Sequence, residues 1–187
     1  KHLHETTDKT DVAGQVIKLA KQLDSSLPIG IGIAGQIHEG VIAFSPVYPP
    51  FLHAAEIQGR RALNIALKTT NASGTEFAID FDAMEQAVAD SPQSPVRLLL
   101  LCHPHNPIGR LFTREELEQL ADFCERHDLY VCSDEVHADL ILDGQTPHLP
   151  FARLLAEHSP TLFRRCITLH GPGKTYNLAG LGIAWAI

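Results

Sequence analysis

The chain has 187 residues, of which 44% are hydrophobic and 20% charged, a composition typical of a folded globular protein. Its formal net charge of −7 argues against nucleic acid or an anionic membrane surface as a partner, because a negatively charged protein repels both. The longest apolar run, residues 98–102, is far too short to span a bilayer, and the first residues lack the apolar region of a signal peptide. We therefore expect a cytoplasmic protein with reduced cysteines.

The first 40 residues differ in pattern from the rest of the chain. Residues 12–23 have the spacing of an amphipathic helix, whereas residues 25–40 are rich in Gly and Ile without a clear period. The segment 30–35 matches the GxGxxG pattern of dinucleotide-binding folds. A strand rather than a helix is expected to follow it, however, so the context that this pattern needs is missing. We interpret residues 1–40 as a divergent N-terminal segment.

From residue 41 onward, short apolar runs alternate with amphipathic helical patterns. Strands are expected at 41–45, 61–68, 96–102, 129–132, 166–169 and 182–187. Helices are expected to begin at Pro49, at Asp80 or Asp82, and at Thr113, where a Thr-x-x-Glu capping box is present. This order predicts right-handed βαβ crossovers and a mostly parallel α/β sheet with flanking helices.

The ends of the sequence bear on its domain organisation. It begins without Met and ends at Ile187, inside the last expected strand. Because domains seldom end within a strand, we expect a piece of a longer chain, with residues 41–187 as its main unit. Ligands bind parallel sheets beyond the carboxyl ends of the strands, so the segments that follow the strands are the places to look for a site.

Two polar segments that follow strands each allow two interpretations. The segment 103–110 (HPHNPIGR) is either a turn in which Asn106 fixes the bend, or a loop that directs the Asn106 amide at a ligand oxygen. The segment 133–139 (SDEVHAD) is either a solvated loop, or it places a carboxylate where it can hold a cation such as a protonated ring nitrogen.

The segment 168–181 (TLHGPGKTYNLAGL) contains a third candidate. The glycines on either side of Pro172 allow the backbone to approach another group closely. Lys174, which follows them, is either an ordinary exposed charge or, if desolvated, a nucleophile toward carbonyl groups. Two metal hypotheses, around Cys102 and around Cys132, lack the spacing of known metal motifs, and no metal site is predicted.

Together these segments resemble the signatures of class I/II aminotransferases, which are fold-type-I enzymes that depend on pyridoxal 5'-phosphate (PLP). The signature segments are Asn106-Pro107-x-Gly109, 133–137 (SDEVH) and 174–181 (KTYNLAGL). The segments 47–51 (VYPPF) and 147–151 (PHLPF) are similar to the branch of cystathionine β-lyase-like C–S lyases. The resemblance covers residues 41–187. It implies a partial large domain with three αβα layers, from which the C-terminal small domain is absent.

The resemblance implies a role for five residues. Lys174 would form the Schiff base with PLP and then act as the base that removes the substrate Cα proton. Asp134 would pair with the pyridinium nitrogen, and Asn106 would hydrogen-bond the phenolic oxygen of the cofactor. Tyr48 would stack on the ring. His137 stands where many aminotransferases carry a Tyr that also contacts the phenolic oxygen.

The implied reaction is β-elimination from a sulfur-containing amino acid, which gives a thiol, pyruvate and ammonia, in a parent protein that is a homodimer. An aminotransferase and a catalytically inactive fragment that keeps only the fold remain alternatives. Gly182 lies where many aminotransferases have an Arg, which favours the lyase. Gly171 and Gly173 lie in the stretch where the family has hydroxyl groups that bind phosphate, and no phosphate-binding loop is recognisable in residues 1–40. This departure favours the inactive fragment.

Overall fold

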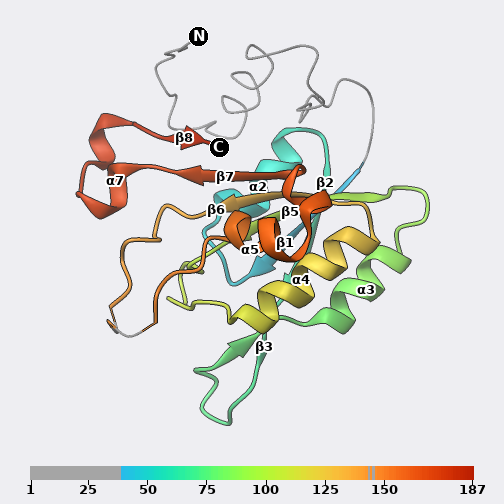
Figure 1. Ribbon diagram of the computed structural model, residues 1–187. Coiled ribbons are helices and arrows are strands. Elements are labelled where there is room, and N and C mark those ends of the chain that lie inside the picture. Colours follow the sequence, from blue (N-terminus) through green and yellow to red (C-terminus); the bar gives the residue numbers. More distant parts are fainter. Residues whose placement is uncertain (1–38, 143, 145) are drawn as a thin grey trace.

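The computed structural model describes residues 39–142, 144 and 146–187 (Figure 1). The predicted helix at 12–23 and the GxGxxG segment at 30–35 lie outside these residues. The proposed boundary near residue 40 stays a prediction, because the described part begins at Glu39, next to the first strand.

Six strands form one sheet in the order β2-β1-β5-β6-β7-β8. The first five in this order pair in parallel, and β8 is antiparallel to β7, so the predicted mostly parallel sheet is confirmed. The strands are β1 Gly40–Ser45, β2 Arg61–Ala66, β5 Val96–Cys102, β6 Tyr130–Asp134, β7 Cys166–His170 and β8 Trp185–Ala186.

Two strand predictions need correction. The strand expected at 61–68 ends at Ala66, and the chain then forms a small antiparallel pair, β3 Lys68–Thr69 with β4 Phe77–Ala78, that extends away from the sheet (Figure 1). The strand expected at 182–187 is reduced to the two residues of β8. The reason is local: Gly182 adopts a left-handed conformation with φ of 60° after the 3-10 turn η1 Ala179–Leu181, so the strand begins only at Trp185.

The helices are α2 Pro50–Ile57, α3 Phe81–Ala89, α4 Arg114–Arg126, α5 Phe151–His158, α6 Pro160–Phe163 and α7 Pro172–Thr175. Asp80, one of the two residues proposed as the cap of α3, accepts a hydrogen bond from Ala83 N–H at 3.0 Å. The capping box of α4 is also confirmed, because Thr113 and Glu116 each bind the backbone N–H of the other, at 3.2 and 2.9 Å. None of the described helices is long and apolar enough to cross a membrane.

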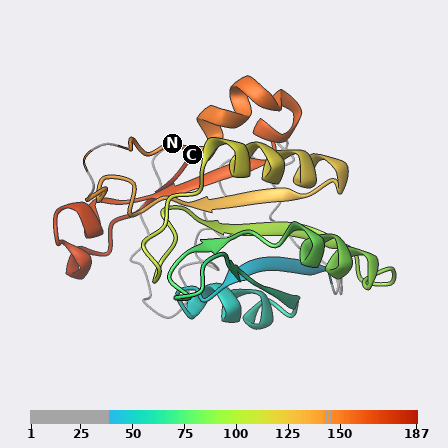
Figure 2. The ribbon, with the colours of Figure 1, turned by 90° about the horizontal axis from the view of Figure 1, so that it is seen from below.

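The strand order places helices on both faces of the sheet. The connections that run from β2 to β5, β5 to β6 and β6 to β7 progress in one direction, whereas the connection from β1 to β2 runs in the other. Right-handed crossovers therefore put α3, α4 and α5 on one face and α2 on the opposite face, as Figure 2 shows for the yellow α4 and the cyan α2. The main core lies beneath α4, where buried side chains of the strands and of α4 form one cluster: Ile42, Phe44, Leu99, Leu101, Val131, Leu117, Leu120 and Phe123.

Candidate active site

The carboxyl ends of β1 and β5 lie side by side at the point where the connections turn to opposite faces of the sheet. Such a switch point is the usual ligand crevice of an open α/β sheet, because the loops after the two strands diverge there. The loop after β1 carries Tyr48 and the loop after β5 carries Asn106. Tyr48 N–H donates a hydrogen bond of 3.1 Å to the Asn106 carbonyl, so the two predicted residues are neighbours.

The loop that carries Asn106 is held by its own backbone and by a buried histidine. His105 N–H donates to the Arg110 carbonyl and Gly109 N–H donates to the His105 carbonyl, each at 2.8 Å. Gly109 has φ of 66°, the left-handed conformation that this tight turn requires. The His105 ring lies with Nε2 2.8 Å from the Pro46 carbonyl oxygen, and burial lowers its pKa. The loop is thereby fastened to the end of β1.

An ion pair joins the same loop to the start of α4. The Arg110 guanidinium donates to both carboxylate oxygens of Glu116, at 3.0 and 2.9 Å, and lies 5.2 Å from the centre of the Phe112 ring. Glu116 also completes the capping box of α4. The position of Asn106 is therefore set by contacts to two different elements.

Asp134 is the last residue of β6 and lies in register with Cys102 of β5 and Leu169 of β7. Its carbonyl accepts a hydrogen bond of 2.9 Å from His103 N–H, and its side-chain Oδ1 accepts one of 3.1 Å from Val136 N–H. Within the described part of the chain, the carboxylate makes no other hydrogen bond. Burial raises its pKa above the ordinary 3.8, although Val136 N–H and the His137 charge oppose this effect. The site therefore holds an acid whose negative charge is poorly compensated.

His137 lies close enough to Lys174 and to Asp134 to interact with both electrostatically. Burial lowers the pKa of His137, the positive charge of Lys174 lowers it further, and Asp134 opposes both effects. Lys174 itself is exposed, on the short helix α7. The neighbouring Thr175 hydroxyl donates to Asp139 Oδ2 at 2.9 Å, which joins α7 to the loop after β6.

Packing accounts for one of the two glycines before Lys174. A Cβ on Gly171 would lie 2.7 Å from the Ile183 carbonyl oxygen, so the backbone that leads to β8 requires glycine there. A Cβ on Gly173 would meet only ordinary contacts, the nearest at 3.7 Å from Ala179. Packing thus gives no reason for glycine at position 173, and the shortage of side-chain phosphate ligands stays a prediction. The segment in which the family's phosphate-binding loop was sought lies mostly outside the described residues.

Two features of this region were missed by the sequence reasoning. The His170 ring stacks on Trp185 with ring centres 5.3 Å apart, a contact made possible by the pairing of β7 with β8. Glu135, which the sequence analysis gave only as part of the segment 133–139, is buried and contacts His148. The segment 147–151 was recognised as a branch signature, but its partner could not be read from it.

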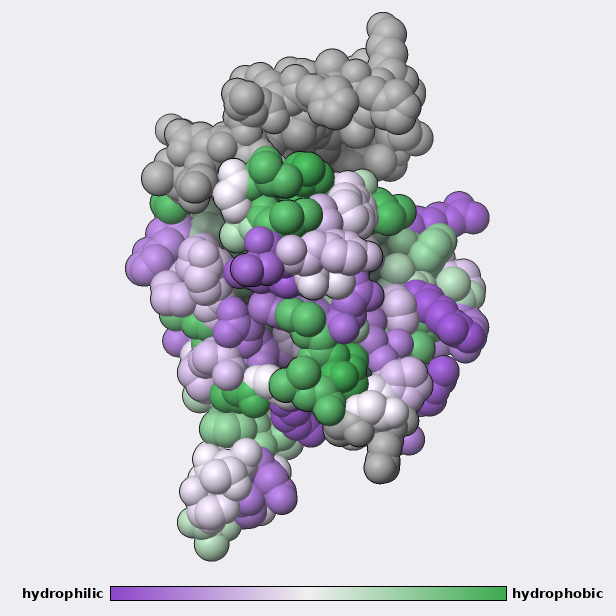
Figure 3. Space-filling view, turned by 90° about the vertical axis from the view of Figure 1, so that its left-hand side faces the viewer, coloured by the Kyte–Doolittle hydropathy of each residue, from purple (hydrophilic) through white to green (hydrophobic). Residues whose placement is uncertain are grey.

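Figure 3 shows the side of the molecule on which α7 lies, where hydrophobic and hydrophilic residues are interspersed. Exposed apolar side chains of the segments around the site are Tyr48, Leu140, Leu142, Tyr176, Leu178, Leu181 and Ile183.

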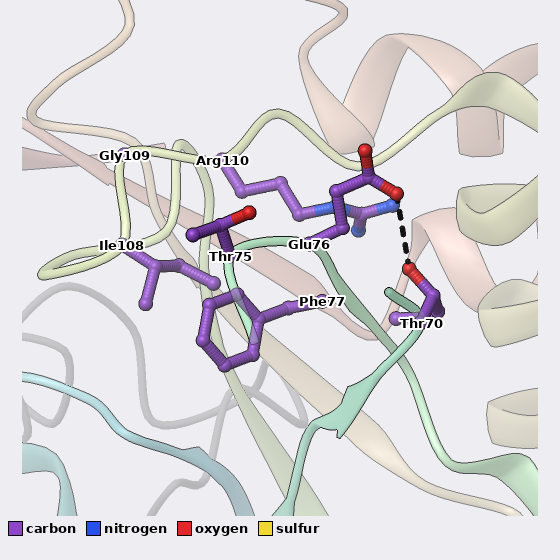
Figure 4. Close-up of a pocket in the computed structure, with 8 residues that line it drawn as sticks. Thr70, Thr75, Glu76, Phe77, Ile108, Gly109 and Arg110 are labelled. Atoms are coloured by element: carbon purple, nitrogen blue, oxygen red, sulfur yellow. Dashed lines mark hydrogen bonds between the residues drawn. The ribbon is translucent and has the colours of Figure 1, made fainter. Parts of the chain in front are cut away.

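A separate pocket of about 380 Å³ lies between the β3–β4 hairpin and the loop after β5. Figure 4 shows the Glu76 carboxylate bonded to the Thr70 hydroxyl at one side of it, at 3.4 Å. Its lining contains none of the five predicted site residues: it consists of Thr70, Thr75, Glu76, Phe77, Ala78, Ile108, Gly109 and Arg110.

The sequence profile described as aminotransferase class I and II matches residues 16–187. The chain belongs to this family. Cystathionine beta-lyase PatB of Bacillus subtilis (strain 168) is 40% identical over 141 residues, which cover 75% of this chain and 34% of that protein. Kynurenine–oxoglutarate transaminase 3 of Rattus norvegicus is 31% identical over 158 residues, covering 83% of this chain and 34% of that protein.

Among solved structures of similar fold is cystalysin of Treponema denticola, which contains a pyridoxal 5'-phosphate cofactor. It is 34% identical, with a TM-score of 0.71 over 81% of this chain and 36% of that one. The motif resemblance is thus confirmed for the family and the fold. The chain spans about a third of the length of the curated relatives it matches.

Proposed function

We propose that this chain is the cofactor-binding part of a PLP-dependent C–S β-lyase that acts on a sulfur-containing amino acid. The observation that carries the proposal is Asp134, a half-buried carboxylate at the carboxyl edge of the sheet with a raised pKa and one hydrogen bond. A cationic ring N–H is the partner that such a carboxylate lacks. Lys174, the candidate attachment point for the cofactor, is near enough to His137 for its charge to lower the pKa of that imidazole.

The remaining predicted residues fit the same cofactor. Bound PLP supplies an electron-withdrawing ring that makes the Cα proton of an attached amino acid acidic. Asp134 would accept a hydrogen bond from the ring N–H, and the Asn106 amide would donate one to the phenolic oxygen. Tyr48, whose backbone is bonded to Asn106, would offer its aromatic face to the ring.

Lys174 has two roles in this proposal. Its Nζ would hold the cofactor covalently, and after the substrate amine takes its place, the free amine would remove the substrate Cα proton. His137, in which burial favours the neutral imidazole, would leave Lys174 without a second fixed positive charge beside it. In β-elimination the thiol would then leave from the substrate Cβ. In transamination the proton would instead be delivered to an atom of the cofactor.

The lyase is preferred because the sequence identity to PatB is 40%, against 31% for the transaminase of rat. In addition, Gly182 stands where many aminotransferases have an Arg. An aminotransferase is the second candidate, supported by the transaminase relatives. We further propose that residues 41–187 are part of the large domain of a homodimeric parent protein.

Addition of PLP tests the cofactor proposal. The protein is expected to develop the visible absorption band of lysine-bound PLP, and Lys174→Ala is expected to abolish it. Lys68→Ala is the matched control, because Lys68 is the other described lysine and pairs with Asp80 away from the site. A folded parent protein without the band would contradict the proposal. So would a band that survives Lys174→Ala.

The reaction is tested on the protein that contains this chain. Pyruvate released from cystathionine without a keto acid indicates the lyase. Glutamate formed from 2-oxoglutarate with an amino-acid donor indicates the aminotransferase instead. If a protein that shows the visible band forms neither product, the inactive alternative is supported.

A further inference from the structure

The residue that follows Asp134 is a buried carboxylate with a full set of partners. Glu135 is 2% exposed. Its Oε1 accepts hydrogen bonds from the Ser133 hydroxyl at 2.8 Å and from Phe151 N–H at 3.0 Å, and its Oε2 lies 2.7 Å from His148 Nε2. Glu135 lies one residue beyond the end of β6 and bonds to Ser133, two residues earlier, whereas the Asp134 carboxylate bonds to Val136 N–H.

Glu135 provides the N-terminal cap that α5 does not have in its own sequence. The residue before α5 is Pro150, which makes no side-chain capping bond. Phe151 N–H, one of the donors that a helix N-terminus leaves without a partner, is instead bound by Glu135, the residue after β6. One carboxylate therefore joins the end of β6, the segment before α5 and the first turn of α5.

The hydrogen bonds to Glu135 stabilise its negative charge. Burial alone would raise the pKa of Glu135, but the hydrogen bonds from His148, Ser133 and Phe151 outweigh burial and lower it. The His148 ring is tilted against the buried His103 ring, with centres 4.7 Å apart. Burial and the His148 charge lower the pKa of His103 to about 4, so His103 is neutral near pH 7. The lowered pKa of Glu135 favours its ionised carboxylate.

The hydrogen bonds of Glu135 adjoin the turn that carries the two predicted site residues Asp134 and His137. Glu135 N–H donates to the Leu169 carbonyl of β7, and its carbonyl accepts from Ala138 N–H, both at 2.9 Å. Within this turn Val136 N–H is bonded to Asp134 Oδ1, and His137 follows. The side chain of Glu135 therefore links this turn to the segment before α5 and to the first residue of α5.

We propose that Glu135 is a positioning residue of the cofactor site: through His148 and Phe151 it fixes the turn that holds Asp134 and His137 in place. Its relevance to the cofactor rests on the function proposed above. The effect on the turn does not, because the contacts are all made by the chain's own residues. The two parts can therefore be tested separately.

Two variants of Glu135 separate position from charge. Glu135→Asp keeps the charge but withdraws the carboxylate by one methylene, so it cannot reach Phe151 and His148 together. Glu135→Gln keeps the length and can still accept from Ser133 and Phe151, but loses the charge. Glu125→Gln is the matched control, because Glu125 also accepts a hydrogen bond from a residue that caps a helix, Ser159, but at the far end of α4.

The first measurements use the cofactor-free protein and follow His137 by NMR titration and Val136 by amide hydrogen exchange. Glu135→Asp is expected to release the turn. The pKa of His137 should then rise toward its ordinary 6.5 as its burial is lost, and Val136 should exchange about tenfold faster, as expected when one or two supporting hydrogen bonds are lost. Glu135→Gln and Glu125→Gln should leave both close to the parent values.

Other outcomes of the His137 titration and the Val136 exchange measurement contradict the proposal. An unchanged His137 titration and Val136 exchange in Glu135→Asp would reduce Glu135 to a contributor to stability. A lowered His137 pKa in Glu135→Gln, with no change in Glu135→Asp, would show an effect of charge instead. If Glu135→Asp does not fold, His148→Phe removes one link of the network, and an unchanged His137 titration in that variant overturns the proposal equally.

The cofactor adds a spectroscopic measurement. In Glu135→Asp the pH midpoint of the visible band should shift and PLP should bind about tenfold more weakly, while Glu135→Gln stays within about threefold of the parent. A parent protein without the band counts against the proposed function, and the cofactor-free measurements still decide the role of Glu135. A band that titrates identically in parent and Glu135→Asp rules out positioning of the cofactor site.

Discussion

Replacement of Asp134 by Asn is expected to stabilise the cofactor-free protein. A buried polar group without its full set of partners costs about 1–3 kcal/mol, and the Asp134 carboxylate has one partner, Val136 N–H. Asn keeps an oxygen for that bond and removes the charge that burial disfavours. The free energy of unfolding should therefore rise by about 1 kcal/mol, which corresponds to an increase in Tm of about 2–4 °C for a chain of this length.

The pH dependence of this gain follows from the direction of the pKa shift. Burial raises the pKa of Asp134, so the folded state favours the uncharged acid. Stability that depends on this proton is present below the unfolded pKa of about 3.9 and is lost as the pH rises through the folded pKa. The Tm difference between Asp134→Asn and the parent should thus be small near pH 4 and grow toward neutral pH.

Thermal unfolding with and without PLP measures both effects. Added PLP should raise the Tm of the parent and have little effect on that of Asp134→Asn. The difference in Tm between the two proteins should therefore narrow or reverse. Asp82→Asn is the control for loss of one charge, since its side chain is 99% exposed, and its Tm should stay close to that of the parent. If Asp134→Asn is no more stable than the parent at neutral pH without cofactor, the reasoning is refuted.

Two further predictions concern the elements around the site. Gly171→Ala should lower the free energy of unfolding by about 1–3 kcal/mol because its Cβ would clash with the Ile183 carbonyl, whereas Gly173→Ala, which meets only ordinary contacts, should change it by less than about 1 kcal/mol. Urea unfolding of both variants checks this, and equal costs would contradict it. Thr113→Ala should cost about 1 kcal/mol by removing the cap of α4, and an unchanged urea midpoint would show that the capping box is dispensable.

Sequence reasoning succeeded where the signal was local. The strand at 96–102 was predicted with its observed bounds because it is a continuous apolar run, and the capping box at Thr113 marked the start of α4. The helix α5 was not predicted, because its cap is Glu135, 16 residues away in the chain, so Pro150 gives no capping signal.

The candidate site shows the same division. Residues that belong to a motif could be named in advance, and the parallel sheet explains why Asn106 and Asp134 lie along one edge. The pairing of Glu135 with His148 and the stacking of His170 on Trp185 depend on how strands and loops fold back, which no local pattern encodes. The assignment of cofactor roles to Tyr48 and the other site residues stays a prediction.

The borrowed cap of α5 has a consequence for the order in which the protein folds. A helix of eight residues is marginal in water, and this one lacks a local signal to start it. We expect α5 to form only after the end of β6 has taken its place in the sheet, so that helix formation reports on completion of the strand that bears Asp134. Over evolutionary time, positions 135 and 148 are then expected to change together or not at all.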